Sequence, residues 1–350
     1  MMKFGVLIDP VYKPEELVEI AEKVEDWDFS SFWYPDEKFF RDCYIGLTLI
    51  AHHTRRINIG TCVTEPYARH PIITAAAIGS LAELAPGRTW LGIGAGGRGF
   101  RAMGIERRRP AVAIREAVHV IRKLLAGEMV HYLGEVISLN ERRLDFIPPQ
   151  DIPVMIATGF GRSIQRLAGE IGDAAMLANY TTPEIIQKGL ERITQGAALV
   201  GRSTDDFRLI SRVDVAVHPD RELARRAVAP VILSNFRSSF PTLDYLEDLP
   251  EFELSSKFLD ALRRKDYQTR TYYRNPEHSA SLIPDVLIDH LSIAGSPDEV
   301  RKQIEAIVQM DVFDEITIHP VLSEGQTVLD CLSLIFDVIS PIDSGNDTNE

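Results

Sequence analysis

INIGTCVTEPYARHPIITAAAIGSLAELAPGRTWLGIGAGGRG, residues 57–99, is the stretch from which the rest of the chain can be interpreted. A β-favouring run opens it and breaks at Glu65-Pro66, which predicts the end of a strand. The pattern then predicts a helix over residues 71–84 and a second strand over residues 89–93 that runs directly into glycines. Such a loop lets a ligand touch the backbone, because no Cβ stands in the way. The glycines of the loop are Gly94, Gly96, Gly97 and Gly99.

Composition limits the class of protein. The chain has 350 residues, 45% of them hydrophobic, which is typical of a soluble globular protein. A net charge of -13 argues against general binding to nucleic acids or anionic membranes, because both need a clustered positive field. No apolar run approaches the roughly 18 residues of a membrane span, and MMKFGVLIDP lacks the pattern of a signal peptide. We therefore expect a cytoplasmic protein.

Eight alternations of strand and helix follow one another along the chain, which predicts a closed parallel barrel, the TIM (β/α)8 fold, with insertions. We expect one domain over residues 1–340, insertions at about 130–140 and 238–290, and a disordered tail over residues 341–350. The first insertion is predicted to be a hairpin and the second mostly helical, and Pro230 is predicted to kink or end the helix that precedes the second. In such a barrel, chemistry belongs at the carboxyl ends of the strands.

The glycine loop formally matches the dinucleotide fingerprint G-x-G-x-x-G, but the acidic residue expected roughly 20 residues later falls inside a predicted helix. A tight turn without a ligand is a second interpretation, and a loop that faces a flat ring or its phosphate tail is the one we favour. An arginine cluster follows the loop. It is either a solvated face balanced by Glu106 and Glu116 or a receptor for a polyanion. The cluster consists of Arg98, Arg101, Arg107, Arg108 and Arg109.

A second glycine loop connects the predicted fifth barrel strand to its helix. Free backbone N–H groups and the helix dipole at such a place attract a phosphate, although a plain glycine turn is the alternative. The candidate residues are Thr158, Gly159, Phe160 and Gly161.

Carboxylates follow the first two predicted strands. Asp36 and Glu37 come after the second strand and Asp9 after the first, so they are candidates for proton exchange or for binding an amine, or else simple helix caps. His70 precedes Pro71 at a helix start, so it is a candidate either for capping that helix or for catalysis. The three cysteines form no CxxC pair and the histidines have no ligand spacing, so neither a disulfide framework nor a metal site is predicted.

Several stretches resemble the luciferase-like monooxygenase superfamily, and within it the deazaflavin-dependent methylenetetrahydromethanopterin reductase group. They are CVTEPYARHP (62–71), TAAAIGSLAEL (74–84), PGRTWLGIGAGG (86–97), RAMGIE (101–106), LAGEIGD (167–173) and SIAGSPD (292–298). The resemblance implies a TIM barrel, usually homodimeric, with coenzyme F420 or FMN at the strand ends. It also implies a cis peptide at Cys62-Val63 under the cofactor ring. Cofactor contacts are accordingly expected at Cys62, Val63, Thr64, Gly94, Ala95, Gly96, Gly97 and Arg98.

The choice of coenzyme follows from charge. The deazaflavin carries a phosphate and an oligoglutamate tail, which the arginine cluster suits better than it suits the single phosphate of FMN. The chain departs from the pterin reductases at Leu7, where they carry a glutamate, and at Glu37, where they carry a histidine. Asp9 lies two residues beyond Leu7, on the same strand face, and is a candidate to replace that glutamate.

We therefore expect a coenzyme F420-dependent oxidoreductase that moves a hydride between C5 of the deazaflavin and a small organic substrate, with Asp36 or Glu37 handling the proton. Two alternatives stay open. One is a two-component FMN monooxygenase of the same superfamily, and the other is a flavin or deazaflavin carrier without catalytic activity.

Overall fold

The computed structural model describes most of the chain. The described residues are 2–97, 99–149, 151–159, 161–204, 207–239, 255–263 and 280–343. They fall into two compact units, each treated by itself below. The N-terminal unit comprises Gly5–Met176 and Glu191–Arg208, and the C-terminal unit comprises Met1–Phe4, Leu177–Leu190 and Leu209–Glu350.

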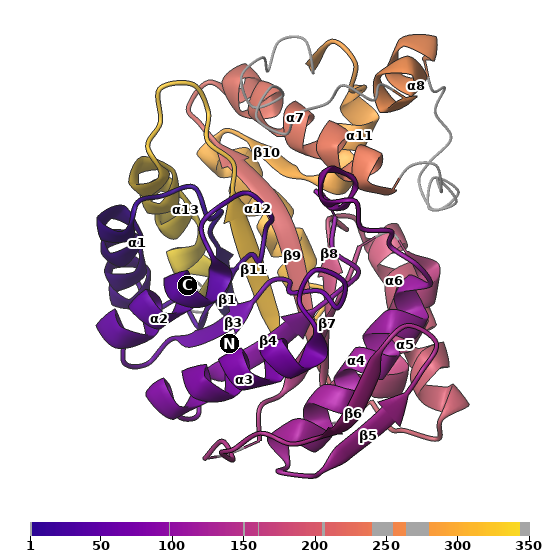
Figure 1. The fold of residues 1–350 in the computed structure, drawn as a ribbon. Helices are drawn as coiled ribbons and strands as arrows, with labels where there is room; N and C mark the ends of the chain where they lie inside the picture. Colours follow the sequence, from indigo (N-terminus) through magenta and orange to yellow (C-terminus); the bar gives the residue numbers. More distant parts are fainter. Residues whose placement is uncertain are drawn as a thin grey trace. The chain divides into compact units, whose positions relative to one another are not determined.

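Parallel strands form the centre of the N-terminal unit (Figure 1). In order across the sheet they are β1 (Lys3–Leu7), β2 (Ser31–Tyr34), β3 (Asn58–Thr61), β4 (Thr89–Ile93) and β7 (Val154–Thr158). Trp33 is paired with Leu7 on one side and with Gly60 on the other, which fixes the register. All four residues of β2 are buried, as expected of a strand covered on both faces.

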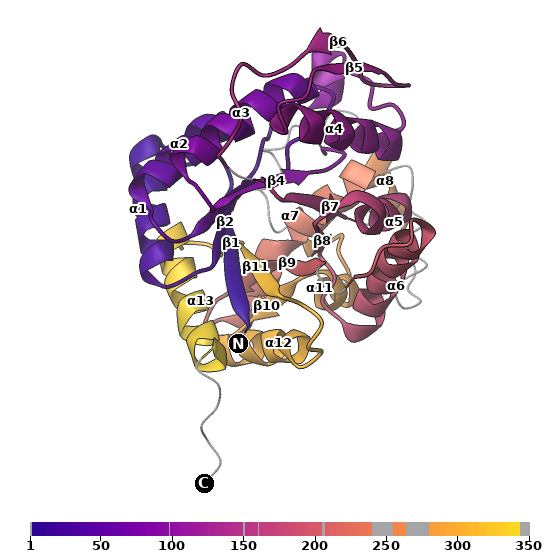
Figure 2. The ribbon, with the colours of Figure 1, turned by 90° about the horizontal axis from the view of Figure 1, so that it is seen from below.

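Helices follow each other along the outside of these strands (Figure 2). They are α1 (Pro14–Asp26), α2 (Cys43–His53), α3 (Pro71–Leu84), α4 (Pro110–Leu125) and α5 (Arg162–Ile171), with a short 3₁₀ helix, η1 (Phe100–Met103). Three of the helices begin with proline, which is compatible with the first helical position because it lacks an N–H. Asp42 caps α2 by accepting hydrogen bonds from the amides of Tyr44 and Ile45.

The predicted hairpin is present. β5 (Val130–Leu133) and β6 (Ser138–Arg142) form an antiparallel pair beside α4 (Figure 1). Buried Glu116 of α4 accepts hydrogen bonds from the amides of Glu135, Val136 and Ile137 at 2.7, 3.0 and 2.8 Å. This carboxylate therefore fastens the turn of the hairpin to helix α4.

The C-terminal unit contains the remaining strands and helices. They are β8 (Ala174–Ala178) and α6 (Pro183–Leu199), each shared with the N-terminal unit, then β9 (Arg208–Val217), α7 (Arg221–Ser239), α8 (Ser256–Arg263), α11 (Asp285–Leu291), β10 (Ile293–Gly295), α12 (Pro297–Val308), β11 (Glu315–Pro320) and α13 (Val328–Asp343). The capping box at Ser296 and Glu299 begins α12 as predicted.

Three expectations for this unit need correction or restriction. Helix α7 continues through Pro230, so the part of the prediction that ended the helix there is wrong, and the alternative of a kink stays a prediction. Strand β10, which pairs in parallel with β9, was not predicted. Helix α13 reaches Asp343, so the first three residues of the predicted tail are helical. The helices α8 and α11 agree with a helical insertion, whereas residues 240–254, 264–279 and 344–350 lie outside the described residues.

The eight parallel strands β1, β2, β3, β4, β7, β8, β9 and β11, alternating with helices, make the fold a TIM barrel, so the predicted fold class is confirmed. The prediction of a single domain stays a prediction. Among the described residues, no helix is both long enough and apolar enough to cross a membrane.

Candidate functional site

Backbone hydrogen bonds join the segments at the carboxyl ends of β3 and β4. The peptide between Cys62 and Val63 is cis, as the resemblance implied. Just beyond it, the Thr64 amide donates to the Gly92 carbonyl and the Gly94 amide donates to the Thr64 carbonyl, both at 3.0 Å. A Cβ on Gly94 would lie only 3.0 Å from Val63 Cγ2. The bulge after β3 and the glycine loop after β4 are therefore held against each other.

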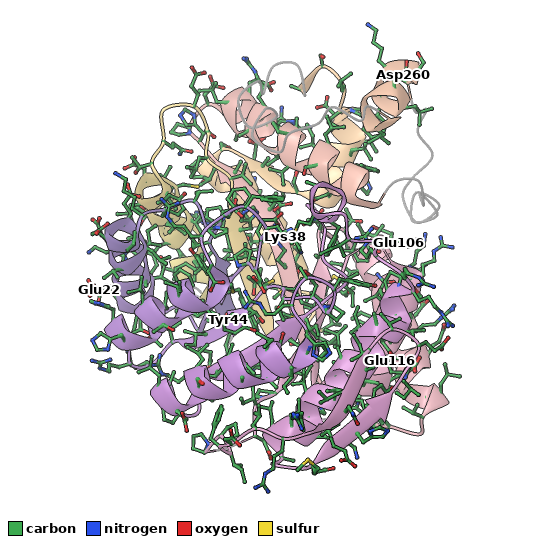
Figure 3. All side chains as sticks on the ribbon, in the orientation of Figure 1. Glu22, Lys38, Tyr44, Glu106, Glu116 and Asp260 are labelled. Atoms are coloured by element: carbon green, nitrogen blue, oxygen red, sulfur yellow. The ribbon has the colours of Figure 1, made fainter. Side chains whose placement is uncertain are left out.

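A buried ion pair between Lys38 and Glu65 lies against the glycine loop. Lys38 Nζ lies 2.9 Å from Glu65 Oε1, with side-chain exposures of 10% and 3%. The ammonium also stands 4.0 Å from the ring centre of Phe100 (Lys38 is labelled in Figure 3). A Cβ on Gly96 would come within 2.9 Å of both Phe100 and Glu65, so only glycine fits this close approach.

Sequence analysis did not single out Lys38 and Glu65. The available signal was their position, because both are charged residues that follow closely after the ends of predicted strands, at the end of a barrel where functional residues gather.

Asp36 is brought to the same end of the strands by the loop after β2. Its Oδ2 accepts hydrogen bonds from Thr64 Oγ1 at 2.8 Å and from Arg69 Nε at 3.0 Å, and its Oδ1 accepts from the Arg69 guanidinium at 3.3 Å. Arg69 also binds Asp42 at 3.0 Å. Because both oxygens of Asp36 are engaged, this carboxylate links the bulge after β3 to Arg69.

The pKa values of two groups beside Arg69 are shifted from their ordinary values. Burial acts to raise the pKa of Asp42, but the amides of Ile45 and Tyr44 and the guanidinium of Arg69 outweigh it and lower the pKa. Burial also raises the pKa of Tyr44, whose ring lies 4.8 Å from the Arg69 guanidinium. Glu37 and Asp9, the other predicted carboxylates, are partly exposed in the loops after β2 and β1.

The arginines of the cluster make different contacts. Arg107 donates to the carbonyl of Gly96 at 2.5 Å and so shapes the glycine loop. Arg109 forms an ion pair with Glu135 of the hairpin. Arg98, predicted to contact the cofactor, lies outside the described residues, as does the side chain of Arg101.

His70 is accounted for by capping. Its Nδ1 accepts a hydrogen bond from the amide of Ile72 at 3.3 Å at the start of α3, and its Nε2 lies 3.0 Å from the Ser138 carbonyl. The capping interpretation of this residue is therefore confirmed.

Hydrogen bonds from Thr158 and Gln165 hold the loop between β7 and α5, and Gly159 in this loop has no described atom near the position that a Cβ would take. Buried Thr158 donates from its hydroxyl to the Met176 carbonyl at 3.0 Å. Gln165 of α5 donates to the carbonyl of Gly159 at 3.3 Å. A Cβ on Gly159 would meet no described atom within 4 Å, and Gly161, the N-cap of α5, supplies no side-chain hydrogen bond to the first turn. Phe160 lies outside the described residues.

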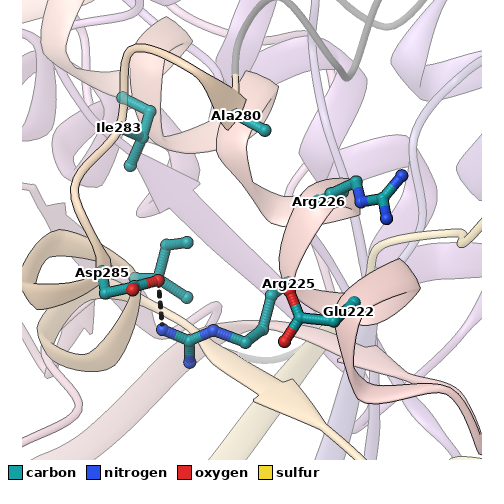
Figure 4. A pocket seen from close by; sticks show the side chains of 7 residues that line it. Glu222, Arg225, Arg226, Ala280, Ile283 and Asp285 are labelled. Carbon is teal, nitrogen blue, oxygen red and sulfur yellow. Dashed lines mark hydrogen bonds and ion pairs between the residues drawn. The ribbon is translucent and has the colours of Figure 1, made fainter.

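A separate pocket of about 360 Å³ lies between α7 and α11 (Figure 4). Arg225 points across it to Asp285 at 2.8 Å and also binds Asp289 at 2.7 Å. Burial acts to lower the pKa of Arg225, but the two carboxylates outweigh it and raise the pKa. The arginine therefore clamps α7 to α11 and stays charged. Among the described residues, no group of three His, Cys, Asp or Glu side chains is arranged to hold a metal ion.

The chain belongs to the luciferase-like monooxygenase family, whose sequence model matches residues 2–314. Among its relatives is the 5,10-methylenetetrahydromethanopterin reductase of Archaeoglobus fulgidus, 34% identical over 322 residues, or 91% of this chain and 94% of the relative. The F420-dependent glucose-6-phosphate dehydrogenase of Mycobacterium avium is 28% identical over 61% of this chain and 68% of its own length.

A solved structure supports the same relationship. The coenzyme F420 dependent tetrahydromethanopterin reductase of Methanopyrus kandleri superposes with a TM-score of 0.81 at 25% identity, covering 97% of this chain and 99% of that protein. The family prediction is thus confirmed.

Proposed function

We propose that the protein is a coenzyme F420-dependent oxidoreductase that moves a hydride between the deazaflavin and a small organic substrate. The observation that carries the proposal is the likeness to the Archaeoglobus fulgidus reductase, which extends over 91% of this chain and 94% of that enzyme. The F420-dependent dehydrogenases among the relatives support the same coenzyme and favour it over FMN.

The residues present fit such a coenzyme. The loop after β4 presents partly exposed backbone at Ala95 and at Gly97, which has no side chain, and half-buried Cys62 and Val63 follow β3, as a flat ring requires. Gly159 lies just before α5, and a Cβ there would meet no described atom within 4 Å. The amides in the first turn of α5 suit a phosphate bound at this position.

The predicted contact residues would hold two parts of the coenzyme, its ring and its phosphate. The ring would rest on Cys62, Val63 and Thr64, against the loop of Gly94, Ala95, Gly96 and Gly97, with Arg98 beside it. The phosphate would lie at the loop made of Thr158, Gly159, Phe160 and Gly161. When bound, the deazaflavin supplies the site for a two-electron hydride at C5.

The chain's own residues orient the reaction and move the proton. Arg69 and Thr64 occupy both oxygens of Asp36, which suits it to holding the site's geometry. Glu37, half-buried in the same loop, is the member of the predicted pair that would exchange a proton with the substrate. The barrel mouth would keep water from the reduced coenzyme.

The proposal extends to assembly and location. We infer a homodimer, supported by Ile45 of α2 and Ile73 of α3, which are 66% and 52% exposed on neighbouring helices. Cys43, Cys62 and Cys331 form no disulfide, which suits the reducing cytoplasm. Light scattering of the purified protein measures the first of these directly, and a monomeric mass would refute it.

Binding of purified coenzyme F420, followed by its fluorescence, tests the proposal. The protein should bind oxidised or reduced F420 more tightly than FMN. Gly159→Ala should weaken binding about tenfold or more while leaving the melting temperature unchanged, because the added methyl group would meet no described atom within 4 Å. No binding of F420 in either redox state refutes the proposal. Oxygen consumption with reduced FMN alone would point to the monooxygenase alternative.

A further inference from the structure

A turn after β2, in the N-terminal unit, carries a phenylalanine that the proposed function has not yet used. The turn runs from Glu37 to Phe40 and is closed by a hydrogen bond from the Phe40 amide to the Glu37 carbonyl at 3.4 Å. Phe39, its third residue, is 71% exposed. A single exposed apolar side chain needs no explanation by itself, because apolar atoms contribute much of the surface of any folded protein. The unusual feature of Phe39 is its backbone conformation.

Phe39 has a φ of 67°, in the left-handed region. A bulky side chain is disfavoured there because its Cβ comes too close to a carbonyl oxygen, and the third position of a turn with positive φ ordinarily holds glycine or asparagine. The turn therefore combines a strained backbone with a ring that is largely in water, and such strain is concentrated at functional sites. The other described non-glycine residues with positive φ are all polar or charged, namely Asp28, Arg109, Glu141, Asn179 and Asp311.

The surroundings of the Phe39 ring place it at the glycine loop after β4. A Cβ on Gly99 would lie 3.2 Å from Phe39 Cε2 and 3.0 Å from Lys38 Cβ, so the turn and the end of the loop approach each other closely. In the sheet, β3 lies between β2 and β4. The turn after β2 therefore meets the loop after β4 beyond the carboxyl end of β3, where the chain forms the cis peptide at Cys62-Val63.

Contacts of the neighbouring Lys38 hold the turn in this place. Its ammonium lies 2.9 Å from Glu65 Oε1, and Glu65 Oε2 in turn accepts a hydrogen bond from the amide of Tyr67 at 2.6 Å. The ring centre of Phe100, which follows the glycine loop, lies 4.0 Å from the same ammonium. The turn is thus fixed to the segments after β3 and β4.

These contacts keep Phe39 beside the glycine loop in the free protein. A contact residue that is already in position loses little freedom when a ligand binds, so more of the contact energy appears as affinity. An aromatic ring suits a flat aromatic or heteroaromatic ligand, because such rings attract each other in offset and edge-to-face arrangements. The exposed side of Phe39 therefore fits a flat ring better than it fits a phosphate or a carboxylate.

We propose that Phe39 is a coenzyme-contact residue whose side chain packs against the ring system of the deazaflavin at the glycine loop. The inference rests on the proposed function, which assigns that ring system to the bulge after β3 and the loop after β4. Contact with the coenzyme takes the phenylalanine ring out of water, which offsets the free energy of holding it on a strained turn.

Phe39→Asn separates this contact from a structural role. Asparagine tolerates the left-handed conformation, so the free variant should melt no lower than the wild type and up to about 3 °C higher. The same variant should bind coenzyme F420 about tenfold more weakly in a fluorescence titration, because the aromatic contact is lost. Phe39→Tyr, which keeps the ring, should bind F420 within about twofold of the wild type. A structural role predicts instead that Phe39→Asn lowers the melting temperature and leaves the affinity of the folded protein unchanged.

A deazaflavin that lacks the phosphate and the oligoglutamate tail locates the contact on the coenzyme. Phe39→Asn should weaken binding of this shortened coenzyme by the same factor as binding of F420. Weaker binding of F420 alone would place Phe39 at the tail and overturn the inference. Leu199→Asn is the matched control and should change neither affinity, because Leu199 is 73% exposed and ends α6, the helix that leads away from the carboxyl end of β8.

The outcomes distinguish this inference from the proposed function. If the wild-type protein binds F420 in neither redox state, both fail. If the wild type binds F420 and Phe39→Asn binds it equally well, only this inference is overturned. The inference is also overturned if light scattering shows that Phe39→Asn dissociates a wild-type dimer, because the exposed ring then covers a partner subunit.

Discussion

Arg69→Gln removes the cation that joins Asp36 to Asp42. The substitution abolishes the two contacts with Asp36, at 3.0 and 3.3 Å, and the one with Asp42, at 3.0 Å. Breaking a buried ion pair costs about 3–5 kcal/mol, whereas an exposed pair contributes about 0–1 kcal/mol. Side-chain exposures of 24% for Arg69 and 16% for Asp36 place this pair between the two limits. We expect a loss of about 2 kcal/mol at pH 7.

The loss should depend on pH in a defined direction. Because the folded-state pKa of Asp42 is lowered, its contribution to stability is complete above the ordinary carboxyl pKa and is lost as the pH falls through the lowered value. The difference between wild type and variant should therefore shrink below about pH 4. An entropy of unfolding of about 2.1 cal/mol/K per residue converts 2 kcal/mol into a fall of about 3 °C in melting temperature at pH 7.

Thermal unfolding monitored by circular dichroism at pH 7 and at about pH 3, below the ordinary carboxyl pKa, measures both effects. Lys123→Gln is the matched control, because Lys123 and Glu128 form a pair at 3.2 Å with exposures of 41% and 51%. The control should change the melting temperature by less than 1 °C. Adding Asp36→Asn to Arg69→Gln should recover part of the loss, since the uncompensated carboxylate disappears. Equal effects of Arg69→Gln and Lys123→Gln, or a loss that is the same at both pH values, would refute the reasoning.

Three further predictions follow from single contacts. Glu116→Gln weakens the charge-assisted hydrogen bonds to the hairpin amides and should cost about 1.5–3 kcal/mol, with earlier tryptic cleavage in the hairpin. Gly92→Ala places a Cβ 1.9 Å from the Thr61 carbonyl oxygen, so it should sharply reduce the yield of folded protein, whereas Gly159→Ala should not. Burial acts to raise the pKa of Glu25, but the amides of Ile57, Arg56 and Arg55 lower it, so the destabilisation caused by Glu25→Gln at pH 7 should fade in acid, as melting curves at both pH values can show.

Local signals in the sequence were sufficient for much of the barrel. Proline and capping residues set the starts of α3 and α12, and buried apolar periodicity identified the helices between the strands. Pro230 does not end α7, which was one of the two predicted outcomes, because the helix accommodates a proline that its local preference disfavours. The three-residue strand β10 was too short to give a pattern, and only its pairing with β9 defines it.

The site was less predictable, because its contacts join residues distant in sequence. The cis peptide at Cys62-Val63 came from resemblance to a family and not from the residues themselves. Asp36 was found by its place after a strand, yet its partner Arg69 is 33 positions away.

The two glycine loops can be told apart by what surrounds each of them. A side chain at Gly94 or Gly96 would strike Val63, Phe100 or Glu65, so these glycines are already required by the protein's own packing. The match to a dinucleotide fingerprint is explained by that close approach of strand and loop. A Cβ on Gly159 would meet no described atom within 4 Å, so packing among the described residues does not require a glycine there, in keeping with the proposed phosphate contact. Substitutions in the two loops should therefore have different effects. A side chain at Gly94 should impair both folding and coenzyme binding, whereas a side chain at Gly159 should impair coenzyme binding alone.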